Sequence, residues 1–238
     1  MSARNTSGDC PQLTWDLLDG ATVLRFSRRS RWSNWPNVRW AARQFWSTQL
    51  SAAEDAPERQ ATWHHLVMTA GNFKRQTPIY LPDLPQGPDS ADDADAPLSF
   101  TFEVDGRNQT VKRDSPDSWE HLSAITGIGV ATATTVLSAL WPGWHVIADR
   151  RDLGVGIGLA YEEAASEGLL RTAGYEGETV SWPRYRWFRP KVIARAAAID
   201  VEAFEVERAM YEIDVETATS VGTPWSDYRR ALCTVLAV

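Results

Sequence analysis

The sequence predicts a mainly α-helical protein that carries one small β hairpin. Apolar residues recur at helical spacing over residues 37–52, where they form one face of a helix. Three more helical stretches follow late in the chain, over residues 184–199, 201–214 and 224–237. Residues 98–113 differ, because two strand-like segments flank the pair Asp105-Gly106, which favours a tight hairpin turn.

Composition bounds the class of protein. A chain of 238 residues can form one large domain or two small ones, and 43% hydrophobic residues is ordinary for a soluble globular protein. No run of about 18 apolar residues is present, so we expect no membrane span, and the N-terminus lacks the apolar stretch of a secretory signal. Two cysteines, Cys10 and Cys233, are too few for a disulfide scaffold or a thiolate metal site. We expect a cytoplasmic protein.

Charge is distributed unevenly along the chain. The net charge of −7 disfavours a nucleic-acid partner, but residues 25–43 contain six arginines and no acidic residue. Residues 76–106 show the reverse pattern, with several acidic residues and no Lys or Arg. Because binding depends on local potential, an acidic protein can still carry a basic groove.

Twelve tryptophans are many for this length. Packing in the core is the general explanation, since aromatic side chains dominate core energetics. Three of them, Trp32, Trp35 and Trp40, lie within the arginine-rich stretch, where they are candidates for a base-stacking pocket.

The first 110 residues are expected to form an N-terminal region and residues 111–238 a C-terminal one, together in a two-lobed unit. Residues 22–26 have the composition of a strand. A helix is expected to begin near Pro57 and to end at Gly71. Residues 82–97 are rich in Pro and Asp, which predicts a solvated loop.

The segment "LSAITGIGVATATTVL", residues 122–137, predicts two helices joined by a glycine corner. The first helix would be capped by Ser115 and end at Ile125. Gly127 and Gly129 permit backbone angles that other residues resist, and a second helix would begin near Val130. Its unpaired N–H groups would suit one phosphate of a nucleic-acid backbone. An ordinary helical hairpin with a glycine-rich turn is the alternative.

An aspartate follows this hairpin at a distinctive distance. Asp149, in "VIADRRDL", lies 22 residues after Gly127. The hairpin "ITGIGVATA" followed by this aspartate resembles the helix–hairpin–helix DNA glycosylase superfamily, which includes endonuclease III and the 8-oxoguanine and adenine-mismatch glycosylases. The resemblance covers residues 116–153, and more loosely residues 184–214.

The resemblance implies a helix–hairpin–helix glycosylase-like fold and a monomer that binds double-stranded DNA without a cofactor. Asp149 would be the catalytic carboxylate that helps to hydrolyse the N-glycosidic bond of a flipped base in DNA repair or in defence. Phosphate would be bound at Gly127, Gly129, Ala131 and Thr132. Carbonyl groups that could hold a monovalent cation would be those of Ser123, Ile125 and Ile128.

Two departures from the family pattern narrow the prediction. The lysine that forms an imine in bifunctional members would fall at Ala131, so we expect a monofunctional enzyme. Two cysteines exclude the four-cysteine iron–sulfur cluster. The four histidines lack metal-ligand spacing, and we expect no structural or catalytic metal.

Other roles stay open for the same residues. Asp149 could instead cap a helix or pair with a neighbouring arginine. Candidate DNA contacts are Arg28, Arg29, Arg31, Arg150 and Arg151. At the level of the whole protein, the alternatives are a DNA-binding protein without catalysis and a helical protein-interaction domain.

Overall fold

The computed structural model describes residues 12–29, 35–50, 56–74, 96–170, 174–175 and 180–237. These residues form a mainly α-helical protein with one two-stranded antiparallel sheet, as the sequence predicts. The first half contains η1 (Trp15–Leu17), α1 (Gly20–Ser27), α2 (Trp35–Leu50), α3 (Ala56–Lys74), β1 (Ser99–Val104) and β2 (Arg107–Lys112). The second half contains α4 (Pro116–Trp119), η3 (Glu120–Ala124), α5 (Val130–Leu140), α6 (Arg150–Leu159), α7 (Tyr161–Ser166), α8 (Trp182–Ala198), α9 (Ala203–Thr217) and α10 (Trp225–Leu236).

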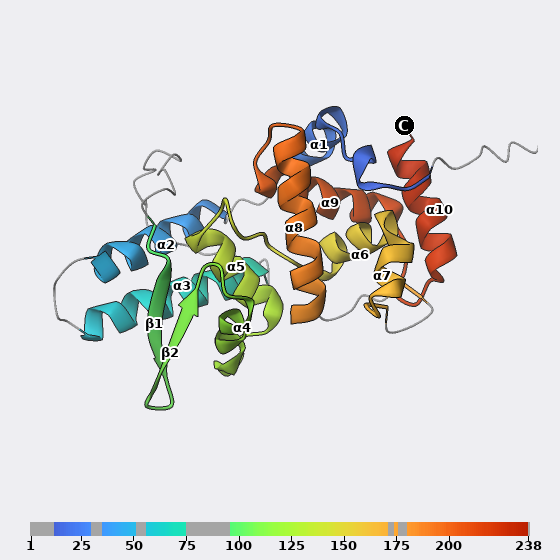
Figure 1. The fold of residues 1–238 in the computed structure, drawn as a ribbon. Coiled ribbons are helices and arrows are strands. Elements are labelled where there is room, and N and C mark those ends of the chain that lie inside the picture. The colour runs from blue at the N-terminus through green and yellow to red at the C-terminus, as the bar shows by residue number, and fades with distance from the viewer. Residues whose placement is uncertain are drawn as a thin grey trace, which may run out of the picture.

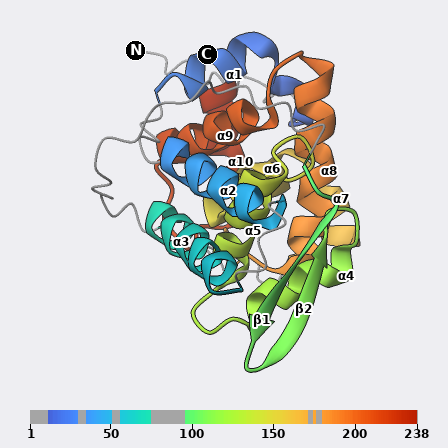
Figure 2. The ribbon, with the colours of Figure 1, turned by 90° about the vertical axis from the view of Figure 1, so that its left-hand side faces the viewer.

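The elements pack in two groups that lie side by side in Figure 1. In the first group, α2 and α3 pack against each other and against α5, with α4 and the sheet beside them (Figure 2). In the second group, α9 packs against α1, α6, α8 and α10. The groups therefore interleave along the chain, because α1 joins the C-terminal helices. The predicted division of one two-lobed unit at residue 110 stays a prediction.

Residues 22–26 are helical, so the strand predicted there is wrong. The Asp19 side chain accepts a hydrogen bond of 2.7 Å from the Thr22 N–H and thereby caps α1. Val23 and Phe26, three residues apart on the helix, are both buried on the packed side of α1, which contacts α9. This packing and the cap outweigh the β-favouring composition of the segment.

The third helix is longer than the sequence predicts. We expected it to end at Gly71, but α3 continues to Lys74. A glycine inside a helix costs about 1 kcal/mol relative to alanine, and packing of α3 against α2 and α5 offsets that cost. The additional turn brings Phe73 against Trp35, with ring centroids 5.5 Å apart. The additional turn also contains Lys74, the last residue of α3.

The hairpin expected over residues 98–113 is confirmed. Asp105 and Gly106 both have positive φ, 50° and 73°, which is the two-residue turn that an Asp-Gly pair favours. Phe100 and Phe102 on β1 are buried and pack against Trp63 of α3. Of the predicted loop, residues 82–95 lie outside the described residues.

A buried histidine joins the two groups of elements. His145 is completely buried, where Nε2 lies 3.0 Å from the Arg113 carbonyl and Nδ1 lies 2.9 Å from the Tyr185 hydroxyl. Loss of hydration lowers the pKa of His145 to about 3, so the ring is neutral. In the fold, His145 therefore has a structural role. Among the described residues, no cluster suits a metal ion and no helix is long and apolar enough to cross a membrane.

Candidate functional site

The glycine corner connects η3 to α5. The predicted first helix consists of four α-helical residues followed by η3, and Ser115 occupies its N-cap without a side-chain hydrogen bond to the helix. Ile125 is extended, and its carbonyl accepts the Ile128 N–H at 3.0 Å. Gly127 has φ +87°, whereas Gly129 is extended at φ −83°. Only Gly127 therefore needs glycine for its backbone angle, which corrects the expectation for Gly129.

Gly129 matters because of the space around it. It is the N-cap of α5, makes no side-chain cap, and is exposed. A Cβ atom at this position would meet nothing within 4 Å. The first N–H groups of a helix have no acceptor inside the helix. The backbone N–H groups of Ala131 and Thr132 belong to this first turn of α5, next to the open space at Gly129. On the inner side of α5, Ala133 and Val136 are buried.

Matched serine substitutions separate these two reasons for glycine. Gly127→Ser should destabilise the fold by about 1–2 kcal/mol, because a Cβ atom is strained at positive φ. Gly129→Ser should leave stability unchanged or slightly raised, since serine is a good N-cap and the site has room. Thermal unfolding measures both. Equal losses of stability would contradict this account of the corner.

A threonine ties α5 to the segment that precedes Asp149. The Thr134 hydroxyl accepts the Ala148 N–H at 3.1 Å, within a buried environment. Thr134 follows Gly129 by five residues, which is about 7.5 Å along a helix axis. Asp149 is the next residue after Ala148, so this hydrogen bond fixes the start of α6 against the N-terminal half of α5.

Asp149 is the N-cap of α6. Its Oδ1 accepts the Arg151 N–H at 2.7 Å and the Asp152 N–H at 3.2 Å, and Asp152 Oδ2 accepts the Asp149 N–H at 3.3 Å. This reciprocal capping box is the structural role that the sequence left open. It occupies one carboxylate oxygen and leaves Oδ2 for another partner.

That partner is Lys74. Its Nζ lies 3.4 Å from Asp149 Oδ2, and the ion pair is with this lysine rather than with a neighbouring arginine. The side chain of Asp149 keeps 20% of its exposure, so Asp149 is half-buried at the start of α6. Burial raises the pKa of Asp149, but Lys74 and the N–H groups of residues 151 and 152 outweigh that effect and hold the pKa below its ordinary value. Asp149 is therefore ionised.

Two buried carboxyl groups support the backbone beneath Asp149. Glu207 Oε1 accepts the Ile147 N–H at 2.6 Å, and Asp152 accepts the N–H of Asp149. Glu207 Oε2 and Asp152 Oδ1 are buried and have no hydrogen-bond partner. Burial raises the pKa of both groups well above ordinary values. Sequence analysis missed both acids, because nothing in their spacing shows that α9 packs against α6.

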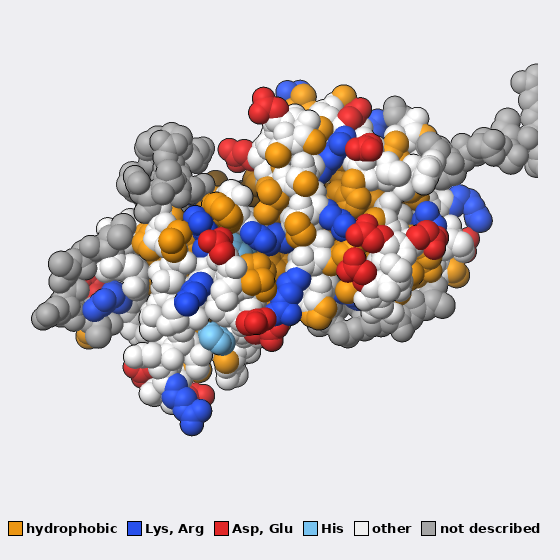
Figure 3. All heavy atoms as spheres, viewed as in Figure 1, with side chains coloured by type: hydrophobic (Ala, Val, Ile, Leu, Met, Phe, Trp, Pro, Cys, Tyr) orange, Lys and Arg blue, Asp and Glu red, His pale blue; other side chains and the backbone are white. Residues whose placement is uncertain are grey.

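The predicted arginine contacts do not form one cluster. Arg150 is exposed beside the carboxylate, but Arg151 pairs with Asp214 at 3.1 Å. At the C-terminal end of α1, the C-cap residue Arg28 is exposed, and the next residue, Arg29, pairs with Glu216 of α9. Arg31 lies outside the described residues. In Figure 3, basic side chains stand in separate small groups on the face shown, among hydrophobic and acidic ones.

The structure describes two of the three tryptophans predicted for the aromatic pocket, Trp35 and Trp40. Trp35 stacks on Phe204 with centroids 4.9 Å apart and also contacts Phe73, the residue before Lys74. It is half-buried at the same end of α3 as the ion pair. Trp40 lies against His65, and Trp32 is outside the described residues. Among the described members of the predicted pocket, Trp35 is thus the one that packs against the C-terminal end of α3, where Lys74 lies.

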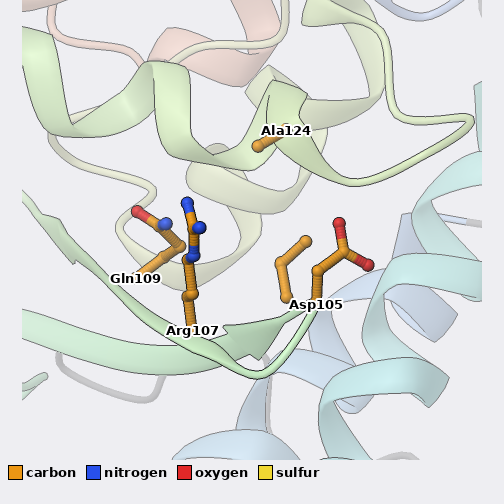
Figure 4. A pocket seen from close by; sticks show the side chains of 5 residues that line it. Asp105, Arg107, Gln109 and Ala124 are labelled. Carbon is orange, nitrogen blue, oxygen red and sulfur yellow. The ribbon is translucent and has the colours of Figure 1, made fainter.

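A cavity of about 380 Å³ lies away from the carboxylate. Figure 4 shows Arg107 and Gln109 of the hairpin extending toward Ala124, at the end of η3. Asp149 does not line it. The monovalent cation was expected at the carbonyl groups of Ser123, Ile125 and Ile128. The Ile125 carbonyl already accepts the Ile128 N–H. The side-chain hydroxyl of Ser123 accepts the Trp182 indole N–H at 3.1 Å.

Comparison with known proteins does not assign this arrangement of hairpin, carboxylate and lysine. The chain matches no described protein family, no curated protein and no solved structure.

Proposed function

We propose that the protein is a DNA glycosylase that hydrolyses the N-glycosidic bond of a damaged, mispaired or modified base after flipping it from duplex DNA. One observation supports the proposal: the residue before an ionised and half-buried aspartate is hydrogen-bonded to Thr134 of the helix that follows the glycine corner. Asp149 would stabilise the positive charge that develops on the deoxyribose and would orient or deprotonate the attacking water. Since Oδ1 caps α6, Oδ2 is the oxygen for this task.

The glycine corner would hold the DNA strand. Backbone N–H groups of Gly129, Ala131 and Thr132 would bind a phosphate near the flipped nucleotide, helped by the positive end of the α5 dipole. The positive φ of Gly127 forms the turn that leads the protein chain from η3 to α5. The exposed Arg150 would contact a second phosphate. Carbonyl groups of Ser123, Ile125 and Ile128 would bind a monovalent cation, as the resemblance implies.

The remaining parts of the proposal follow from the same chemistry. The half-buried Trp35 would form one wall of the base pocket. The enzyme would act on double-stranded DNA as a monomer in the cytoplasm, and hydrolysis by water requires no cofactor. The alternative is a DNA-binding protein without catalysis, in which Asp149 serves only as a helix cap.

A panel of duplexes distinguishes the two. Each duplex carries one damaged, mispaired or hypermodified base, and released base is scored after alkali converts abasic sites to strand breaks. We expect release from at least one duplex. Binding in a gel shift without alkali-labile sites on any duplex would reject the enzyme in favour of the binding protein.

Gly129→Ser should weaken DNA binding without unfolding the protein. The new side chain would stand where a phosphate approaches and would cap the N–H groups that bind it. Phosphate contacts carry little sequence information, so affinity should fall equally for duplexes of unrelated sequence. Fluorescence anisotropy measures this effect. Gly143→Ser, at another exposed glycine with open space, is the control and should bind normally.

A further inference from the structure

The packed face of the β hairpin ends in polar residues. Residues that lie opposite each other on paired strands share a face, and so do alternate residues along one strand. On β1 the buried face carries Phe100 and Phe102. Gln109 is the cross-strand partner of Phe102, and the next pair toward the turn is Val104 with Arg107. In Figure 4, Arg107 and Gln109 accordingly extend toward the protein rather than away from it.

These side chains line the cavity of about 380 Å³ between the hairpin and η3. Val104 and the turn residue Asp105 line it from the hairpin, and Ala124, the last residue of η3, lines it from the other side. Its volume lies in the range of about 300–1,000 Å³ that is typical of sites for small organic ligands. Because Asp149 is not among the lining residues, this cavity is separate from the proposed catalytic group.

The polar groups of the cavity determine which ligand it suits. Within the part of the chain that the structure describes, the side chains of Asp105, Arg107 and Gln109 form no hydrogen bond and no ion pair. The two opposite charges disfavour a simple anion, which Asp105 would repel, and a simple cation, which Arg107 would repel. A ligand without net charge fits, provided that it offers acceptors to the guanidinium and donors to the carboxylate.

We propose that the cavity binds an unpaired guanine base. Guanine has two adjacent acceptors, O6 and N7, which match the fork of Arg107. It also has two adjacent donor groups at N1 and N2, which match the two carboxylate oxygens of Asp105, and no other standard base has such a donor pair. Val104 and Ala124 supply apolar contacts for the ring. In a duplex, N1 and N2 are paired with cytosine, so the ligand is a free guanine nucleotide or a guanine in single-stranded DNA.

Analogues of guanosine monophosphate that lack single groups test each pair of hydrogen bonds. The inosine nucleotide lacks the amino group at N2, and the 7-deazaguanosine nucleotide lacks N7. Titration calorimetry should show that each binds at least about tenfold more weakly than guanosine monophosphate. Equal affinities for all three would overturn the proposal. Binding of free glutamine, with no preference for guanine, would also overturn it and would indicate a site for zwitterions.

Two substitutions test the protein side of the same contacts. Asp105→Asn removes the paired acceptors but keeps the hairpin, because Asn-Gly also favours this turn. Arg107→Lys keeps the charge but loses the planar fork. Each variant should bind guanosine monophosphate at least about tenfold more weakly and unfold at the wild-type temperature. Glu103→Gln, on the opposite face of β1, is the control and should bind normally. Wild-type affinity in both cavity variants would contradict the site.

A second arm identifies the source of the base. Fluorescence anisotropy compares a single-stranded oligothymidylate with the same strand carrying one central guanine. A preference for the guanine strand that Asp105→Asn abolishes would assign the site to DNA, whereas binding of the mononucleotide alone would assign it to a free nucleotide. No guanine preference in either arm would overturn the inference. Asp149→Asn should bind guanosine monophosphate normally, so a failure of the proposed base release would leave this site standing.

Discussion

Asp149→Asn is expected to slow base release by about 10²- to 10⁴-fold. Asn keeps a side-chain oxygen for the N–H groups of Arg151 and Asp152 and is a preferred N-cap, so α6 should begin as before. The variant loses the negative charge on Oδ2, which is the charge that would stabilise the developing cation at C1′. Single-turnover release from the preferred duplex of the panel measures the effect.

Two controls separate catalysis from folding. Affinity for the same duplex should stay within about tenfold of wild type, and thermal stability should stay close to it. Asp149→Ala, in contrast, should lose about 1 kcal/mol because the cap is lost with the charge. A loss of binding as large as the loss of base release would contradict the catalytic role of Asp149.

The pH profile offers a further check on the same group. Burial alone would raise the pKa of Asp149. Lys74 and two backbone N–H groups lower this pKa by more, so the carboxylate stays ionised at pH values where an ordinary aspartate begins to protonate. Base release should therefore hold as the pH falls to about 4, provided that the protein stays folded. A decline centred near pH 6 would indicate another titrating group.

Glu207→Gln is expected to stabilise the protein at pH 8 and to have little effect near pH 4. Burial raises the pKa of Glu207 in the folded state, while the unfolded carboxyl titrates at about 4.3. The unfolded state therefore releases its proton first, and the stability of the wild type falls as the pH rises toward the folded pKa. Each pH unit between the unfolded-state pKa and the folded-state pKa of Glu207 lowers the free energy of unfolding by about 1.4 kcal/mol. Gln cannot titrate and escapes this loss.

Urea unfolding at several pH values measures the difference between the two proteins. Lys74, Asp149 and Asp152 also act on this site, and they are the same in both proteins, so their titration largely cancels. Glu207→Leu is the control for shape, since it removes the acceptor of the Ile147 N–H and should cost about 1–3 kcal/mol even near pH 4. Parallel curves for wild type and Glu207→Gln would show that Glu207 does not titrate as inferred.

Local patterns predicted much of the secondary structure. Apolar spacing located α2, α5, α8, α9 and α10, and the Asp-Gly pair located the hairpin. The errors occurred where a long-range contact competes with local composition. Val23 and Phe26 are on a helix because α1 packs against α9, and α3 passes Gly71 because it packs against α2 and α5.

The candidate site also combines features that local sequence determines with features that long-range packing determines. The sequence by itself determined the glycine corner and Asp149, because backbone angles, helix caps and short spacings depend on residues close together in the chain. Only the tertiary structure decided which groups face Asp149: Lys74 lies 75 residues before it, and Glu207 lies 60 residues after Ile147. Such partners are determined by how helices pack, and packing depends on the summed burial of many side chains that no local pattern records.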